Sequence, residues 1–138
     1  MLFPKLRTYA KFKITFNREP YLILLNNSKE ITTLARLRMS SHKLEIEKGR
    51  HTRPKTELNL RTCQRCCRPV IDDEMHFLVS CDVFNSKREE LFIKINNLFP
   101  DFINTADDDK LKILLSSEDS RFIKPVAKYV NMCFNELK

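Results

Sequence analysis

The chain has 138 residues, of which 42% are hydrophobic and ten are Phe, so it can form one domain with a real core and does not belong to the disordered class. A single Gly argues against a hairpin-rich β architecture, and no apolar stretch is long enough to cross a bilayer. The five Cys are an odd number and the amino-terminal residues lack a secretory signal pattern, which predicts an intracellular location, in the nucleus or the cytoplasm.

The net charge of +7 is distributed unevenly along the chain. Residues 1–70 carry an excess of eleven positive charges, and residues 71–138 carry an excess of four negative charges. A polyanionic partner is therefore expected to meet the amino-terminal half, although any single Lys or Arg is as well explained by a solvated helix face.

Apolar periodicity predicts helices in the amino-terminal half. Residues 5–16 have an amphipathic helical pattern, and Pro20 suits the first turn of a short helix, PYLILL. Ser28 is expected to cap a third helix. Its inward positions are expected to be Ile31, Leu34 and either Leu37 or Arg38.

The segment HKLEIEKGR, residues 42–50, either resumes that helix after Ser40 and Ser41 or forms a separate short element. Leu44 is expected to point inward, and the residues expected in solvent are Glu45, Glu47 and Lys48. Gly49 lies where a helix would end in the left-handed conformation. Residues 50–62, which are polar, basic and contain Pro54, predict a loop.

Three helices are predicted in the carboxy-terminal half. The first follows Cys81 and ends at Pro100, with its inward face made by Phe84, Arg88, Leu91, Ile95 and Leu98. Asp107, Asp108 and Asp109 are interpreted as acids at the start of the second. Asp119 introduces the third, which Pro125 is expected to delay until about Lys124 and in which Cys133 is expected to be a buried thiol.

Four residues between these halves have the spacing of a zinc site. Cys63 and Cys66 form a C-x2-C pair, and His76 and Cys81 follow to give C-x2-C-x9-H-x4-C. Three thiolates and one imidazole close a four-coordinate shell, so the predicted Zn²⁺ is structural rather than catalytic. The nearby Arg61, Arg65 and Arg68 are expected to compensate its negative charge and to point their guanidinium groups outward.

Other interpretations of this segment stay open. A C-x2-C pair can act in redox chemistry, the thiols can be buried without a metal, and Cys67 can replace Cys66 as the ligand. The segment IDDEMHFLVSC fits a short helix with its three acids in the first turn. Because five residues of an α-helix turn Cys81 about 140° away from His76, the helix is expected to break before Cys81, or His76 and Cys81 are expected to lie on two consecutive helices.

The stretches LARLRMSSHKLEIEKGRH, RTCQRC and IDDEMHFLVSCDVFNSKREELF resemble the carboxy-terminal region that follows the reverse transcriptase in non-LTR retrotransposon polyproteins. There, a basic helix leads to a CCHC zinc segment and then to an aromatic residue and an arginine, matched here by Phe84 and Arg88. The resemblance implies contact with element RNA or target DNA. It gives Cys63, Cys66, His76 and Cys81 as zinc ligands, with Arg36, Arg38, His42 and Lys43 on the adjoining basic helix.

Taken together, these patterns predict an all-α domain of five or six helices with one structural zinc. Residues 1–62 would form a basic helical region with a linker, residues 63–81 the CCHC segment, and residues 82–138 helices that pack on the same core. The expected function is nucleic-acid binding without enzymatic chemistry, with RNA or DNA and the rest of a retrotransposon polyprotein as partners. The phosphate contacts are expected from Arg36, Arg38, His42, Lys43, Arg50, Arg53 and Lys55.

Two alternative functions belong to other classes. A zinc-stapled helical module can bind a partner protein, and a transposon relic can fold without a present role. A nuclease site is a further alternative, because the Pro-Asp pair in FPDF and a downstream acid resemble the nuclease motif that some such elements carry after the zinc segment. Only 37 residues follow Asp101, too few for such a core, and Asp101 is better explained as the cap of a turn.

Overall fold

A computed structural model describes Tyr9, residues 21–116 and residues 119–137. The helix expected over residues 5–16 lies, apart from Tyr9, outside the described residues. The helices are α2 (Tyr21–Leu24), α3 (Ser28–Arg38), α4 (Glu45–Lys48), α5 (Asn85–Leu98), α6 (Asp107–Ser116) and α7 (Ser120–Asn135). The described part of the chain has no strand, which confirms the all-α class, and none of its helices is long and apolar enough to span a membrane.

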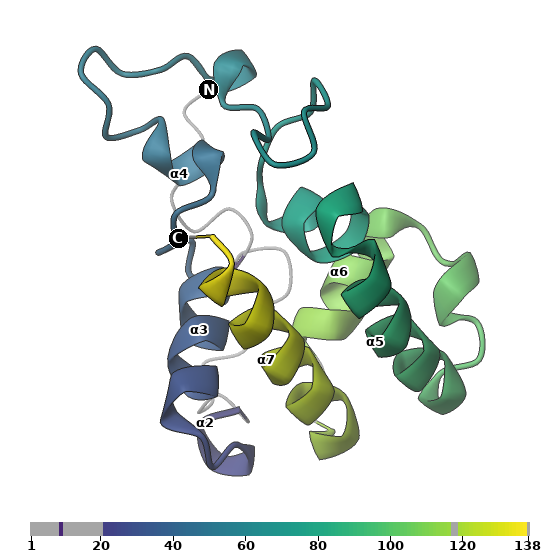
Figure 1. The fold of residues 1–138 in the computed structure, drawn as a ribbon. Coiled ribbons are helices and arrows are strands. Elements are labelled where there is room, and N and C mark those ends of the chain that lie inside the picture. The colour runs from purple at the N-terminus through teal and green to yellow at the C-terminus, as the bar shows by residue number, and fades with distance from the viewer. Residues whose placement is uncertain (1–8, 10–20, 117–118, 138) are drawn as a thin grey trace.

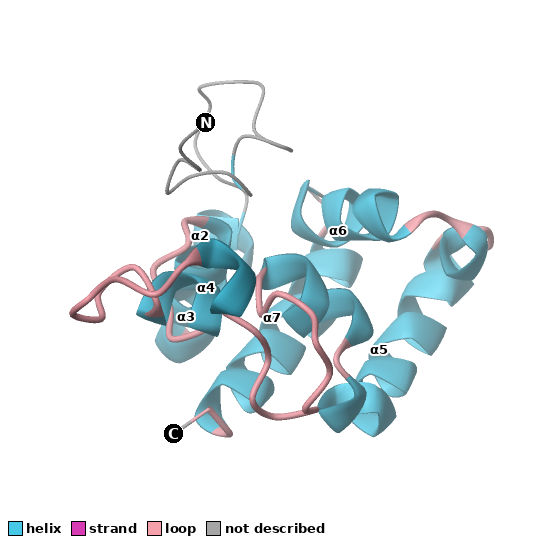
Figure 2. Cartoon of the chain, turned by 90° about the horizontal axis from the view of Figure 1, so that it is seen from above, coloured by secondary structure: helices cyan, strands magenta, loops and turns pink. Residues whose placement is uncertain are grey.

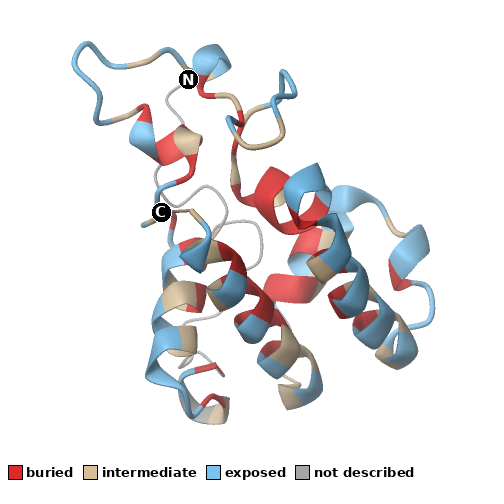
Figure 3. Cartoon of the chain, in the orientation of Figure 1, coloured by how far each residue is buried: buried red, intermediate tan, exposed pale blue. Residues whose placement is uncertain are grey.

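Helix α7 lies at the centre of the molecule. It packs against α2 and α3 on one side and against α5 and α6 on the other (Figures 1 and 2). Its inward residues are Ile123, Val126, Ala127, Tyr129, Val130 and Cys133, and the buried surfaces of its neighbours face it (Figure 3). Helix α7 therefore joins the two halves that the charge distribution distinguishes.

The cap of helix α3 lies one residue earlier than expected. Asn27, rather than Ser28, has the extended backbone of a cap, and its side chain accepts hydrogen bonds from the amides of Lys29 and Glu30. Leu37 and Arg38 both face inward at the other end. Arg38 stacks over the ring of Tyr21, with 5.1 Å between the guanidinium carbon and the ring centroid, and donates to the carbonyl of Leu115.

Helix α4 is a separate short element, and the expectation that Glu47 faces solvent is wrong. Leu44 is buried as predicted, but Glu47 is buried as well and pairs with Arg50 at 3.7 Å. Gly49 ends the helix with a right-handed φ of −63°, so the expected left-handed conformation is also wrong. A Cβ at this position would lie 2.6 Å from Cγ of Arg61, so Gly49 is required by close packing and not by its backbone angle.

The carboxy-terminal helices follow their predicted faces. Arg88, Leu91 and Ile95 are buried on α5, and α6 begins with its three aspartates in the first turn. Asp119 caps α7 by accepting from the amide of Arg121 at 2.8 Å. The expected delay at Pro125 is wrong, because α7 is helical from Ser120 onward and the carbonyl that loses its N–H partner belongs to Arg121, an exposed residue.

Candidate metal centre

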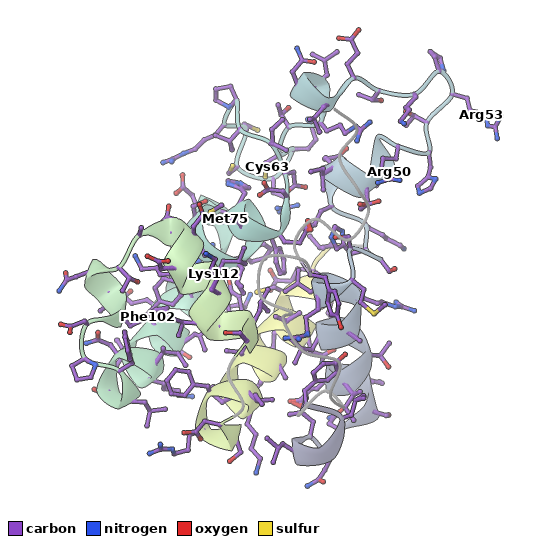
Figure 4. All side chains as sticks on the ribbon, turned by 180° about the vertical axis from the view of Figure 1, so that it is seen from behind. Arg50, Arg53, Cys63, Met75, Phe102 and Lys112 are labelled. Carbon is purple, nitrogen blue, oxygen red and sulfur yellow. The ribbon has the colours of Figure 1, made fainter. Side chains whose placement is uncertain are left out.

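The first two candidate ligands lie in a loop that antiparallel pairing closes at its base. Thr62 forms an isolated bridge with Ile71, and the amide of Cys63 donates to the carbonyl of Val70 at 3.0 Å. The loop therefore starts and ends at neighbouring points, which holds the C-x2-C turn against the segment that supplies His76. In Figure 4, Cys63 lies close to Met75, at the start of that segment.

Cys63, Cys66, His76 and Cys81 meet at one point. Their ligand atoms all lie within 4.8 Å of one another. Sγ of Cys63 is 3.9 Å from Sγ of Cys81, and Sγ of Cys66 is 3.5 Å from Nε2 of His76. The structure therefore brings together the CCHC set that the spacing predicts, and these four side chains could hold a metal ion.

Cys67 lies outside this cluster. Its backbone is left-handed, with φ at 57°, and its exposed thiol points to the carbonyl of Gln64 at 3.9 Å. The left-handed residue turns the chain directly after Cys66, and the amide of Arg68 then donates to the Cys66 sulfur. Among the two neighbouring thiols, Cys66 is therefore the one placed for metal binding.

A π-helical turn, His76–Ser80, places the other two ligands. The amide of Cys81 donates to the carbonyl of His76 at 2.7 Å, which is the i to i+5 bond of a π-helix. The helix stops before Cys81, whose backbone is extended, as the sequence predicts. The wider turn brings residues five apart over each other, which an α-helix would not do.

Neighbouring polar groups orient His76. Nδ1 lies 3.2 Å from Oγ of Ser80, which leaves Nε2 facing the cysteine sulfurs. The backbone amide of His76 donates to Oδ1 of Asp73 at 2.8 Å. Such outer contacts fix the ring orientation of metal-binding histidines.

Arg65 supplies positive charge beside the cluster. Its guanidinium donates to Asp72 at 3.0 and 2.6 Å and lies 3.9 Å from Sγ of Cys81. The guanidinium also lies over the ring of Phe84, 5.5 Å from its centroid. Asp72 is fully buried and in addition accepts from the amide of Glu45, so the same contacts connect the metal centre to α4.

The expected outward orientation of three arginines is only partly correct. Arg61 is buried and donates to the carbonyls of Ile46 and Thr56, both at 3.0 Å. It therefore holds the chain around α4 instead of facing solvent. Arg68 is exposed and pairs with Asp82 at 2.7 Å.

Arg88 fixes the backbone around the last ligand. Its buried guanidinium donates to the carbonyls of Leu78 and Cys81 at 3.2 and 2.6 Å, and to Oδ1 of Asn85 at 2.8 Å. A further donation reaches the carbonyl of Phe77 at 3.5 Å. These carbonyls lie at the end of the π-helical turn, where the regular helical hydrogen bonds stop, so Arg88 supplies donors to the backbone there, and the carbonyl of Cys81 also accepts from the amide of Phe84 at 3.3 Å.

Phe77 connects the metal centre to the core. Its ring lies 5.4 Å from that of Phe84 and 5.1 Å from that of Phe134, measured between centroids. Tyr129 of α7 lies near the same ring. The π-helical turn therefore contributes side chains to the interior as well as ligands to the cluster.

The ligand pKa values favour metal binding at neutral or higher pH. Burial raises the pKa of the Cys63 thiol to about 12, against donations from the amides of Cys66 and Arg65. Burial lowers the pKa of His76, so its imidazole is neutral at neutral pH and can act as a ligand. A cation that binds here must displace the proton of Cys63.

We therefore expect metal affinity to fall as the pH falls. Release of the Cys63 proton alone predicts a change of about tenfold per pH unit, and protonation of His76 should add to this only in more acidic solution, because burial lowers its pKa. Competition with a chromophoric chelator between about pH 8 and about pH 5 measures the effect. An affinity that does not change with pH would contradict the assignment of Cys63 as a ligand.

The basic residues predicted to contact phosphate separate into two groups. Arg36, Lys43, Arg53 and Lys55 are exposed, and Arg50 is half-buried beside Glu47. Arg38 is buried, as described above, and only 1% of the His42 side chain is exposed. The expectation that these two side chains face a nucleic acid is therefore corrected, because both point into the fold.

His42 belongs to a buried polar cluster that the sequence did not indicate. Its Nε2 lies 3.3 Å from Oε2 of Glu74, and Oγ of Ser40 donates to the other carboxylate oxygen at 2.8 Å. The amide of Leu44 donates to Nδ1 of His42, which leaves the proton on Nε2, toward Glu74. The sequence places Glu74 in the first turn of a short helix and gives no sign of its complete burial, which reflects a tertiary link between the segment after α3 and the metal segment.

Some residues of the centre had only weak sequence signals. Asp72 and Glu74 have the pattern of acids at a helix start, and Ser80 is marked only by its position four residues after His76.

Comparison with protein-family models, with curated proteins and with solved structures finds no match to this chain.

Proposed function

We propose that the Cys3His centre binds one structural Zn²⁺. In a tetrahedral site with Zn–S near 2.3 Å and Zn–N near 2.0 Å, two sulfurs are about 3.8 Å apart and a sulfur and a nitrogen about 3.5 Å. The corresponding distances here are 3.9 Å for Cys63 and Cys81, and 3.5 Å for Cys66 and His76. Four protein ligands leave no coordination position for a substrate, which supports a structural role.

We propose that the module held by this zinc binds nucleic acid through its phosphates. The observation that carries the proposal is the loop of residues 50–55, which projects from the fold at the same end of the molecule as the metal segment (Figures 1 and 4). Arg53 lies at its outer tip, and Lys55 is also exposed. The loop encloses a hollow of about 590 Å³ lined by Arg50, His51, Thr52, Arg53, Pro54 and Lys55.

A second basic patch supports the same proposal. Arg36 of α3 and Lys43, just after it, line a hollow of about 180 Å³ next to the carboxy-terminal end of α7. Both residues are exposed, and no carboxylate among the described residues lies within ion-pair distance of either. Cations that are free of carboxylate partners can pair with phosphates, which gives affinity with little sequence preference.

The resemblance to the region after the reverse transcriptase of non-LTR retrotransposons suggests the origin of the module. We propose that it is a segment of such a polyprotein, with element RNA or target DNA and the rest of the polyprotein as its partners. Its own contribution would be binding without chemistry. The extended spacer of nine residues between Cys66 and His76 distinguishes it from retroviral zinc knuckles, so base reading of the knuckle type is not part of the proposal.

We expect the zinc-loaded protein to bind single-stranded RNA and duplex DNA with a steep salt dependence. Between about 50 and about 200 mM salt, affinity should fall at least tenfold, because each neutralised phosphate releases counterions. The variant R53Q/K55Q should bind more weakly and lower the slope of log K against log salt by about 1 to 2. Fluorescence anisotropy with oligonucleotides of mixed sequence measures both quantities.

The control variant K110Q/K112Q removes the same charge from α6, away from the loop, and should leave the slope unchanged. Binding that is absent, or that does not change with salt, would contradict the nucleic-acid function. The alternative of a protein-interaction module, or of an inert relic, would then be favoured.

A further inference from the structure

A third basic surface lies in the half of the chain where acids outnumber bases. The ends of α3, α5 and α7 enclose a cleft of about 710 Å³. Its lining includes four cations, Lys94, Arg121, Lys124 and Lys128, and a single acid, Glu30. This surface is therefore positively charged, although residues 71–138 carry more acids than bases.

The three lysines of this cleft are available to a ligand. Lys94, Lys124 and Lys128 are exposed, and no carboxylate among the described residues lies within ion-pair distance of them. Arg121 differs, because it pairs with Asp119 at 2.7 Å. Lys124 and Lys128 are one helical turn apart on α7, so they present their charges side by side.

Several acids of this half lie away from the cleft, and Asp119 is paired with Arg121. Asp72 and Glu74 are buried in the metal segment, and Asp107, Asp108 and Asp109 begin α6. The cleft therefore keeps its positive charge, although the surrounding sequence is acidic on balance.

The cleft continues along the seam between α5 and α7. A neighbouring hollow of about 140 Å³ shares Lys94, Pro125 and Lys128 with it. Its other lining residues include Glu90 and Lys87, and Lys87 is paired with Glu136. The lysines thus follow an elongated groove rather than a single point, which suits a chain of phosphates better than one isolated anion.

Side chains, and not helix ends, make this groove attractive to anions. Asn27 and Asp119 cap the first turns of α3 and α7, so some of their amides are already satisfied. Asn26 and Asn97 add amide groups to the lining, which can hydrogen bond to phosphate or sugar oxygens.

The groove is at the opposite end of the molecule from the loop of residues 50–55. In Figure 1, α2, the start of α3, the start of α7 and the end of α5 lie at the bottom, and the loop lies at the top. Helix α3 lies between the two regions. It is about 16 Å long, because an α-helix rises 1.5 Å per residue. A single short strand would therefore not contact both surfaces at once.

We infer that the groove between α5 and α7 is a second phosphate-backbone site, so that one molecule holds two nucleic-acid segments at once. This inference rests on the proposed nucleic-acid function, because it assigns the first segment to the loop. The ligand is recognised by its phosphodiester charges, which are contacted by Lys94, Lys124 and Lys128. No base-specific contact is needed for this role.

The test is a bridging measurement on the whole zinc-loaded protein. A single-stranded oligonucleotide of about twelve residues is fixed to a surface, and the capture of a second, labelled oligonucleotide through bound protein is recorded. The unchanged protein should capture the second strand. K124Q/K128Q should still bind the surface strand but lose most of the capture, and its salt slope should fall by about 1 to 1.5.

The control variant K110Q/K112Q should capture as well as the unchanged protein. R53Q/K55Q should lose capture as well, because the loop holds the other strand. An oligonucleotide with an uncharged methylphosphonate backbone should not be captured, since the groove recognises phosphate charge.

The outcomes separate the two proposals. If the unchanged protein binds no oligonucleotide, the nucleic-acid function itself fails. If it binds the surface strand normally while K124Q/K128Q captures the second strand as efficiently as K110Q/K112Q, the groove is not a binding site and only the present inference is overturned. Capture carried by protein dimers would give this second result.

Discussion

Cys63→Ser is expected to abolish stoichiometric metal binding and to unfold the metal segment. Zinc binding to comparable structural sites contributes about 10 kcal/mol or more, and a serine oxygen does not replace a thiolate. Cys63 is itself buried in the core, with its Sγ 3.9 Å from that of Cys81. The loss should therefore spread beyond the loop and remove most of the stability of a domain of this size, which is about 5 to 15 kcal/mol.

The chain offers a matched control for this change. Cys67→Ser makes the same substitution in the same loop, but its thiol is exposed and lies outside the cluster. It should keep one equivalent of zinc and the thermal midpoint of the unchanged protein. His76→Ala should resemble Cys63→Ser.

Metal analysis and circular dichroism of the purified variants measure both effects. Purified wild-type protein without stoichiometric zinc would refute the zinc assignment directly. Equal metal content and equal thermal unfolding of Cys63→Ser and Cys67→Ser would show that Cys63 is not a ligand.

Arg88→Met is expected to destabilise the zinc-loaded protein by about 3 to 5 kcal/mol. The methionine fills part of the space but leaves the carbonyl of Leu78 without its side-chain donor and removes the charged donor of the Cys81 carbonyl, which keeps only the amide of Phe84. Charged hydrogen bonds of this kind contribute about 1.5 to 3 kcal/mol each. Because Cys81 belongs to the Cys3His cluster, its misplacement should also weaken the proposed zinc binding, which a purely packing role would not do.

Arg36→Met is the control for this prediction. Arg36 is exposed on α3, so its replacement should change the free energy of unfolding by about 0.5 kcal/mol or less. Urea unfolding at saturating zinc and chelator competition are the two measurements. If Arg88→Met matches Arg36→Met in both, Arg88 does not position the metal centre.

The sequence predicted the helices best where apolar spacing and caps agree. The face of α5, the aspartates of α6 and the cap at Asp119 all follow from local rules of helix formation. The cap of α3 was displaced by one residue, because Asn27 and Ser28 are both good caps and only the backbone geometry selects between them. At Pro125 the packing of α7 against its neighbours overrides the local preference to break the helix.

The candidate site was predicted from the sequence for a chemical reason. Cysteine and histidine at fixed short spacings can reach one cation whatever surrounds them, so the four ligands follow from the chain itself. The choice of Cys66 over Cys67 could not be made in this way. It depends on the left-handed backbone at Cys67, which turns that thiol away from the cluster.

The roles of the charged residues were decided by the tertiary structure. His42, Asp72 and Glu74 have the sequence pattern of exposed residues, yet their side chains are buried because partners from distant segments satisfy them. The lysines of the groove lie in a stretch with negative balance and become one positive surface only when α5 and α7 pack together. By itself, the sequence determined the helices and the ligand set, since both depend on residues close along the chain. Which charges face a partner depends on contacts between residues far apart in sequence, and only the fold brings these together.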